Sequence, residues 1–172
     1  MRLELSKLKQ EKVNFQFTES AEELDLRADG VEFGSPLKVK VEVSPSGESF
    51  LAWAKIETRV KLECVRCLLI YSYPLQAEFN LLIEKQRPGL LLDPGNEDTV
   101  VINPQDKFID ISDRIRQAIA LSLPLKSLCS PDCKGLCDIC GADLNTSPCS
   151  CTIEEYDSRW DKLKQALKKE RD

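Results

Sequence analysis

The chain has 172 residues, of which 42% are hydrophobic and 31% are charged, values typical of one soluble domain or of a domain with a small appendage. Its formal net charge is −5, which argues against a general polyanion binder. The sequence contains eight cysteines and no histidine. Without histidine, the chain cannot form a Ser-His-Asp triad, a Cys-His nucleophile pair or a mixed Cys/His zinc finger.

The amino-terminal segment MRLELSKLKQEKVNF alternates apolar and charged residues and lacks the apolar run of a signal peptide. No stretch of the sequence approaches the length of a transmembrane helix. We therefore expect a cytoplasmic protein without membrane contact. In a reducing cytosol, clustered cysteines bind metal more often than they form structural disulfides.

Residues 1–104 predict an antiparallel, hairpin-rich β-region. Apolar and charged residues alternate in the stretches 37–43 and 55–64, which the turn residues 44–47 separate. The same alternation continues over residues 69–83, as expected for half-buried strands.

Three local features refine this β-region. The second and third stretches predict two long strands hinged at Cys64-Val65-Arg66-Cys67. Pro74 cannot donate a ladder hydrogen bond, so we place it at a sheet edge or a bulge. Asp29-Gly30, which follows Leu24 and Leu26, is a dipeptide typical of hairpin turns.

The segment 87–99 is rich in proline and glycine and predicts a loop, followed by a short strand at 100–102. Residues 105–128 predict a helix and a connector. Apolar residues at helical spacing place the helix at 110–123, and Pro124 ends it.

Residues 129–151 predict a zinc-ribbon-like region, because six of the eight cysteines fall there in a segment too short and polar to fold by burial alone. Residues 152–172 predict an amphipathic helix at about 153–170, with Thr152 and Glu155 forming a capping box. Its apolar positions are Ile153, Tyr156, Trp160, Leu163 and Leu167. We expect Tyr156 and Trp160 to pack against the sheet. The predicted fold is α+β, with all four segments in one compact unit.

The cysteines are the candidate metal ligands, and they form four close pairs: Cys64/Cys67, Cys129/Cys133, Cys137/Cys140 and Cys149/Cys151. Two intervening residues allow a tight turn to aim both sulfurs of a pair at one ion, and four thiolates form a closed tetrahedral shell for Zn²⁺. Gly141 suits a turn in which the backbone approaches a sulfur. The pattern therefore predicts two four-cysteine zinc sites, with Arg66 and Lys134 offsetting their negative charge.

Three pairings of the four pairs are possible. Short loops close at the lowest entropic cost, which favours one site from Cys137, Cys140, Cys149 and Cys151. Cys64 and Cys67 would then meet Cys129 and Cys133 at a second site. Loop entropy grows only logarithmically with length, so side-chain packing can outweigh this preference.

Other cysteine chemistries fit the spacing less well. The sequence lacks the C-x2-C-x2-C-x3-C-P run of bacterial ferredoxins, although an iron–sulfur cluster remains an alternative. Redox-active thiols would need a following helix that lowers a thiol pKa. A catalytic zinc ion would need an open coordination position, which four cysteines usually close.

Three segments resemble, in the same order, the YceD family of large ribosomal RNA subunit accumulation proteins of bacteria and plastids. They are Cys64-Val65-Arg66-Cys67-Leu68, Leu121-Ser122-Leu123-Pro124 and residues 133–145. The resemblance implies a non-enzymatic factor that supports accumulation of large-subunit ribosomal RNA through ribosome assembly or rRNA processing. The chain resembles the bacterial, cytoplasmic form.

Two binding hypotheses follow. The factor could bind large-subunit rRNA or a pre-ribosomal particle through a local basic surface, for which the weak candidates are Lys162, Lys164, Lys168, Lys169 and Arg171. These cations are equally typical of the C-terminal end of a helix, where positive charge interacts favourably with the helix dipole. Alternatively, the acidic body could bind a basic ribosomal protein, as a zinc-stabilised protein interaction module without RNA contact.

An rRNA-processing enzyme is the third hypothesis, and we predict no catalytic residues. A nuclease would need clustered carboxylates for Mg²⁺, and Asp106, Asp110 and Asp113 offer only a weak version. Their ordinary role is helix capping and an acidic first turn. The sequence leaves the oligomeric state open.

Overall fold

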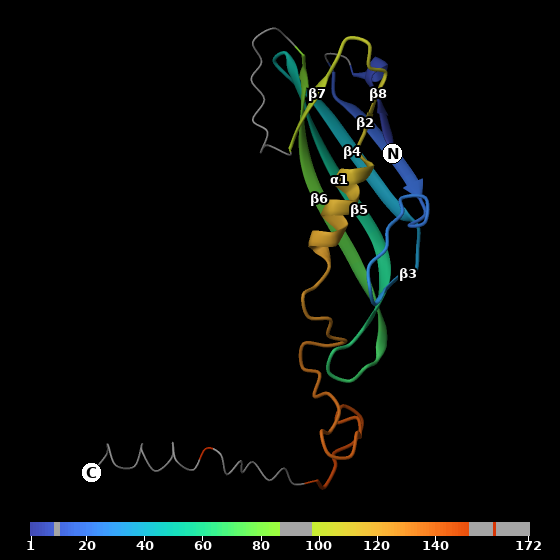
Figure 1. Cartoon of the computed structure of the whole chain (residues 1–172), viewed down its shortest axis with the longest axis vertical. Coiled ribbons are helices and arrows are strands. Elements are labelled where there is room, and N and C mark those ends of the chain that lie inside the picture. The colour runs from blue at the N-terminus through green and yellow to red at the C-terminus, as the bar shows by residue number, and fades with distance from the viewer. Residues whose placement is uncertain (9–10, 87–97, 152–159, 161–172) are drawn as a thin grey trace, which may run out of the picture.

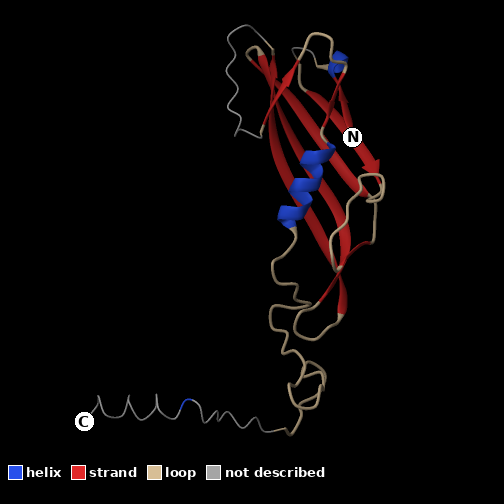
Figure 2. Ribbon diagram, in the orientation of Figure 1, coloured by secondary structure: helices blue, strands red, loops and turns tan. Residues whose placement is uncertain are grey.

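The computed structural model describes residues 1–8, 11–86, 98–151 and 160. A long twisted sheet forms most of this part, one helix lies on the sheet, and the cysteine-rich loops extend from one end (Figures 1 and 2). The predicted C-terminal helix lies outside the described residues, except for Trp160, whose side chain is 60% exposed.

The main sheet has the strand order β2-β4-β5-β6-β7, and β3 pairs with β5 beyond the end of β4. The strands of this sheet are β2 (Val13–Glu19), β3 (Val31–Phe33), β4 (Leu37–Ser46), β5 (Ser49–Glu63), β6 (Ile70–Lys85) and β7 (Thr99–Ile102). A second, two-stranded sheet pairs β1 (Arg2–Glu4) with β8 (Phe108–Asp110), and the 3-10 helix η1 (Leu5–Lys7) follows β1.

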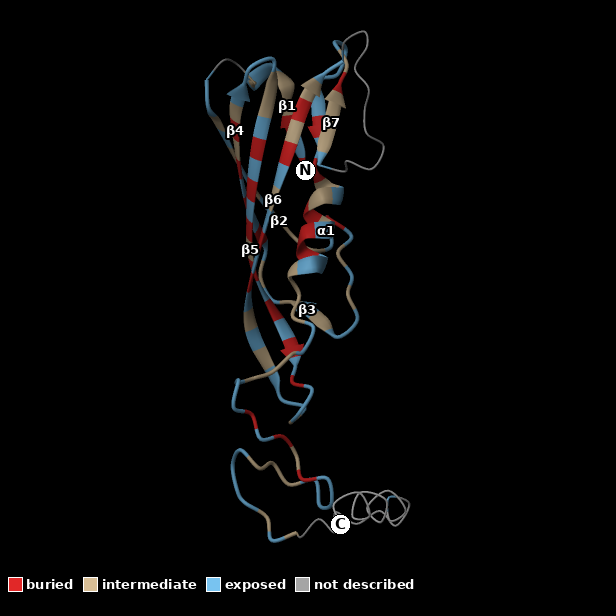
Figure 3. Cartoon of the chain, turned by 90° about the vertical axis from the view of Figure 1, so that its left-hand side faces the viewer, coloured by how far each residue is buried: buried red, intermediate tan, exposed pale blue. Residues whose placement is uncertain are grey.

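The predicted strand alternation is confirmed in β4 and β5. Most apolar residues of these strands are buried and their charged neighbours lie on the opposite face, which Figure 3 shows as alternating bands of burial. Among the exceptions, Leu51 and Trp53 of β5 are exposed. β5 and β6 form one long antiparallel hairpin whose tip contains Cys64 and Cys67, as the sequence predicted. Pro74 lies in β6 opposite Arg59, on a stretch of β6 that β7 does not reach, so it occupies a sheet edge.

Three predicted details are wrong. The sheet is not purely antiparallel, because β7 pairs with β6 in the parallel sense, from Leu82↔Thr99 to Lys85↔Ile102. β4 continues through Pro45 to Ser46, and the turn is Gly47-Glu48, with Gly47 at a φ of +65°. The turn at Asp29-Gly30 does not join a hairpin, because the buried Leu24 before it lies in a turn and β3 after it pairs with β5.

The helix α1 (Ser112–Ser122) is shorter than predicted, because Asp110 belongs to β8. Ile115, Ala118 and Ile119 on one side of α1 are buried in the same core as the inward residues of the sheet. Full burial of each isoleucine contributes about 1.5–3 kcal/mol. This packing fixes the end of α1, and therefore the start of the connector that leads to Cys129.

Candidate metal centres

The cysteines form two clusters of four. The first cluster contains Cys64, Cys67, Cys129 and Cys133, and the second contains Cys137, Cys140, Cys149 and Cys151. Within each cluster, all sulfur atoms lie within 4.8 Å of one another. Loop entropy favoured this grouping of the cysteine pairs. The structure does not show either of the other two groupings.

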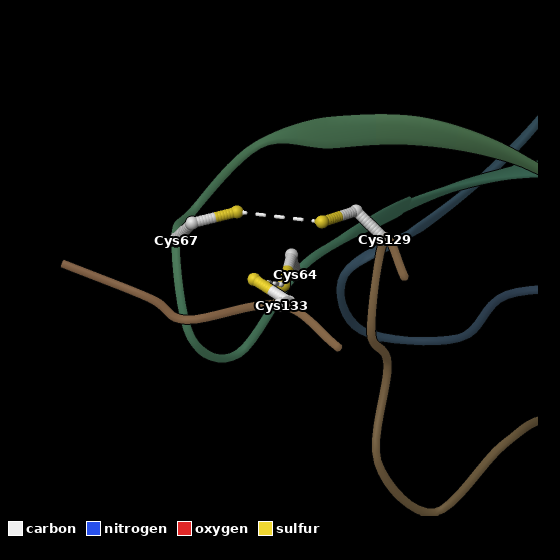
Figure 4. A group of neighbouring side chains, drawn as sticks. All are labelled: Cys64, Cys67, Cys129 and Cys133. Carbon is white, nitrogen blue, oxygen red and sulfur yellow. Dashed lines mark hydrogen bonds between the residues drawn. The ribbon is translucent and has the colours of Figure 1, made fainter. Parts of the chain in front are cut away.

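The tip of the β5–β6 hairpin supplies the first half of the first cluster. The Cys64 amide donates to the Leu69 carbonyl oxygen at 2.9 Å, and the Leu68 amide donates to the Cys64 carbonyl oxygen at 2.9 Å. Leu68 adopts a left-handed conformation with φ of +60°, which lets the chain turn back immediately after Cys67. The turn thus places the sulfurs of Cys64 and Cys67 on one side of the hairpin (Figure 4).

The connector after α1 supplies the second half of the first cluster. It is tied to the hairpin tip by the Val65 amide, which donates to Ser127 O at 2.9 Å, and by the Arg66 guanidinium, which donates to Cys133 O at 2.7 Å. The role predicted for Arg66 was only to offset charge, so this bond adds a positioning role. Two segments far apart in the chain therefore meet around Cys129 and Cys133 (Figure 4).

The sulfur separations in the first cluster fit a shared tetrahedral ion. Cys64 Sγ lies 3.8 Å from Cys133 Sγ, and Cys67 Sγ lies 3.6 Å from Cys129 Sγ (Figure 4). Four sulfurs at about 2.3 Å from a tetrahedral ion lie about 3.8 Å apart. A disulfide would bring two sulfurs to about 2.05 Å, so these cysteines are free thiols placed around a common centre.

The second cluster uses the same turn. The Cys137 amide donates to Ala142 O at 2.8 Å, and the Gly141 amide donates to Cys137 O at 2.8 Å. Gly141 has a φ of +70°, which confirms the expected sharp turn after Cys140. A glycine here adopts the conformation that Leu68 adopts in the first cluster.

The two clusters are joined by a short, hydrogen-bonded segment that sequence reasoning missed. The Asn145 side chain accepts from the Lys134 amide at 2.8 Å and donates to Cys133 Sγ at 3.5 Å. It also donates to Asp143 Oδ1 at 2.7 Å. Asn145 therefore connects a sulfur of the first cluster to the loop of the second. Asn145 ends the segment 133–145 that carried the family resemblance, but nothing in the sequence identified these partners.

The thiols in each cluster differ in acidity. Burial disfavours the Cys64 thiolate, but backbone N–H groups, led by that of Cys129, lower the pKa of Cys64 to about 6. A backbone hydrogen bond from Cys140 is the largest effect that lowers the pKa of Cys137 to about 6. Hydrogen bonding to a neighbouring cysteine side chain, with burial, raises the pKa of Cys129 and of Cys151 to about 12. Mutual repulsion opposes four thiolates in so small a space, and a bound cation would remove that penalty.

The other predicted site residues do not form a second kind of centre. In the described part of the chain, the two cysteine clusters are the groups with metal-binding geometry, and no carboxylate trio joins them. Asp106 bonds to the Asn103 amide, Asp110 to the Ser112 amide, and Asp113 to Arg116. The basic candidates Lys162, Lys164, Lys168, Lys169 and Arg171, together with Tyr156, lie outside the described residues.

The fold and the site define a sheet protein that carries two four-cysteine centres on one end. A family model described as "Large ribosomal RNA subunit accumulation protein YceD" matches residues 53–167, well over half of the chain. The chain belongs to the YceD family. The matched region begins within β5 and includes all eight cysteines.

The chain is also similar to curated proteins of a bacterium and of plants. An uncharacterised protein of Mycobacterium tuberculosis is 31% identical over 142 residues, which cover 83% of this chain and 67% of that protein. The chloroplastic large ribosomal RNA subunit accumulation protein YCED homolog 1 of Arabidopsis thaliana is 28% identical over 76% of this chain and 48% of its own. The protein of the same name in Zea mays is 31% identical over 73% of this chain and 52% of its own.

The chain thus spans about half the length of these plant relatives. No solved structure matches the chain. None of the helices in the described residues has the length and apolar character needed to cross a membrane.

Proposed function

We propose that this protein is a non-enzymatic, zinc-binding factor that supports accumulation of large-subunit ribosomal RNA by binding a pre-ribosomal particle. The observation that carries the proposal is the pair of four-cysteine clusters in a member of the YceD family. The plant relatives are named for large ribosomal RNA subunit accumulation, and that role is extended here to this chain. Its proposed location is the cytoplasm.

Zinc is the metal that this ligand set suits best. Four thiolates in a tetrahedral arrangement satisfy Zn²⁺ completely, and the sulfur separations of 3.6 and 3.8 Å agree with its bond length. A structural zinc site contributes about 10–16 kcal/mol of folding free energy. The net stability of a whole domain is of the same size, about 5–15 kcal/mol. The cysteine-rich end would therefore depend on zinc for its folding.

A binding role fits the site better than catalysis does. A four-cysteine shell leaves no open position at which a metal-bound water could attack a substrate. In the described residues, the carboxylates of Asp106, Asp110 and Asp113 each have separate partners instead of sharing a centre. The proposed role of the metal is therefore structural: it would stabilise the fold of a binding surface.

A second candidate is contact with a basic ribosomal protein instead of RNA. The net charge of −5 favours it, because an acidic surface attracts a basic partner and repels phosphates at long range. Pull-down from lysate with and without ribonuclease separates the two. Partners that survive digestion support protein contact, and partners that vanish support RNA contact.

The function is tested by deleting the gene in the native host and restoring it as wild type or as Cys67→Ser. We expect deletion to lower the ratio of large-subunit to small-subunit rRNA, and only the wild-type chain to restore it. Sucrose-gradient fractionation should place the wild-type chain with large-subunit precursors. An unchanged rRNA ratio after deletion would contradict the proposal.

A further inference from the structure

The sheet face opposite α1 is not covered by any element in the described part of the chain. Along β4 and β5, residues such as Val41 and Ala54 point into the core and are nearly inaccessible to solvent. Their neighbours Lys40, Trp53 and Lys55 are exposed on the other face. Figure 3 shows this alternation along the strands, with α1 on one side of the sheet. We call the uncovered side the outer face.

Trp53 lies near the middle of the outer face and is 55% exposed. On either side of it, Glu42 of β4 and Asn80 of β6 occupy the same register row. A hollow of about 320 Å³ adjoins its ring. The polar and charged residues that line it are Asn14, Gln16, Lys40, Glu42 and Lys55. A large aromatic side chain left half in water in the middle of a sheet is available to stack on a ligand.

Two lysines lie side by side at the hollow. Lys40 lies directly opposite Lys55 in the ladder, and like charges in this position are destabilising. Three carboxylates lie nearby: Glu57 is 3.0 Å from Lys55, Glu42 is 2.6 Å from Lys12, and Glu78 of β6 is directly opposite Lys55 in the ladder. Lys40 and Lys38, two residues apart and both exposed, make no direct ion pair within the described residues, although after Lys55 both also lower the pKa of Glu57. An anion bound at the hollow would relieve this repulsion.

We propose that the outer face binds single-stranded RNA, with a base stacked on Trp53 and the adjacent phosphate held by Lys40 and Lys55. Aromatic side chains on an open sheet stack unpaired bases, and lysines neutralise the backbone phosphates. The side-chain amides of Asn14 and Gln16 are placed to hydrogen-bond to base edges. This inference rests on the proposed function, since it names the surface by which the factor would contact rRNA.

The composition of the face favours RNA over a protein partner. Leu51 is the other exposed large hydrophobic residue near the hollow, and polar side chains occupy most outward positions of β4 and β6 around it. The core of a protein interface is usually more apolar than this. The overall acidity of the chain limits long-range attraction, so the expected binding is local and salt-dependent.

The test uses the full-length, metal-loaded chain with Trp160→Phe, which leaves Trp53 as its one tryptophan. Titration with oligouridylate and oligoadenylate should quench Trp53 fluorescence saturably, with affinity that falls as salt rises. In anisotropy with labelled oligonucleotide, Trp53→Ala should weaken binding about 10-fold, and Trp53→Phe should retain most of it. Lys40→Gln should weaken binding and reduce the slope of log affinity against log salt by about 1.

Two variants serve as matched controls. Leu51→Ala removes an exposed apolar side chain from the same strand and face without touching the hollow, and Lys61→Gln removes a lysine held by Glu32 at 2.8 Å. Both should bind as tightly as the wild type. Absence of binding by the wild type, or unchanged affinity in Trp53→Ala, would overturn the inference. A ribonuclease-resistant protein partner that is lost only in Trp53→Ala would overturn it too.

The result is separable from that for the proposed function. Oligonucleotide affinity is measured with purified protein, whereas the role in rRNA accumulation is measured by the rRNA ratio after gene deletion. A normal rRNA ratio together with Trp53-dependent binding would reject the proposed function and keep the RNA site. A lowered ratio together with Trp53-independent binding would keep the proposed function and reject the RNA site at Trp53.

Discussion

The first cluster joins cysteines that lie 62 and 69 residues apart, Cys67 with Cys129 and Cys64 with Cys133, whereas the second is confined to residues 137–151. Two cysteines of the first cluster are buried, against one in the second, in which Cys140 is exposed. An ion at the first cluster would close long loops and fasten the cysteine-rich end to the sheet. An ion at the second would organise only its own loop. Ions at the two clusters would therefore serve two structural purposes, which differ in the length of chain that each spans.

Loss of the first cluster should have the largest effect. Cys67 occupies the second position of its turn, and Cys67→Ser would remove one of the thiolates that bridge the hairpin to the connector. We expect the opening free energy of residues 125–151 to fall by roughly 5 kcal/mol, part of the about 10–16 kcal/mol of a zinc site. Hydrogen exchange at the Val65 and Leu136 amides measures it. Unchanged protection there would show that packing alone holds the two segments together.

The second cluster offers the matched variant, because Cys140 occupies the same position in its own turn as Cys67. Cys140→Ser should lower the opening free energy of residues 137–151 by about 3 kcal/mol and leave the unfolding temperature of the sheet unchanged. Calorimetry together with hydrogen exchange separates the two effects. A lowered unfolding temperature of the sheet would mean that the second cluster also supports the rest of the fold.

Gly135→Ala tests the contact between the hairpin tip and the segment that links the clusters. Gly135 has a φ of +80°, and an added Cβ would lie 3.0 Å from the Arg66 carbonyl oxygen. Strain and contact together should cost about 2 kcal/mol by chemical denaturation. Gly141→Ala is the control, since its φ of +70° is similar but its Cβ would meet nothing within 4 Å. Equal destabilisation by the two variants would count against a role for the Arg66 contact.

Leu68→Gly should have the smallest effect and the opposite sign. Leu68 holds the left-handed conformation that Gly141 holds in the second cluster, and its side chain is 57% exposed. Relief of strain exceeds the added freedom of glycine in the unfolded chain, so we expect a gain below about 1 kcal/mol. Thermal unfolding of the metal-loaded protein measures it. A loss of stability would mean that the freedom glycine adds to the unfolded chain outweighs the strain it relieves.

Local patterns in the sequence predicted the elements that depend on neighbouring residues. The alternation at 37–43 and 55–64 identified β4 and β5, and the apolar spacing of Ile115, Ala118 and Ile119 identified α1. The grouping of the cysteines also followed from distance along the chain, because loop closure depends on chain length.

Features that depend on distant residues could not be read in the same way. Nothing in residues 99–102 shows that β7 runs parallel to β6, since strand periodicity is the same in both orientations. The glycine at 135 is explained by Arg66, which lies far away in the sequence. Asn145 is a further example, because its bond to Cys133 Sγ arises only when the loops of both clusters are folded.

Native mass spectrometry of the full chain, purified without added metal, tests the central claim most directly. We expect a mass equal to the polypeptide with two zinc ions, and one ion fewer in both Cys67→Ser and Cys140→Ser. Hydrogen exchange on the same sample should show residues 129–151 protected until the metal is removed by a chelator. A bare polypeptide that keeps this protection would contradict the account.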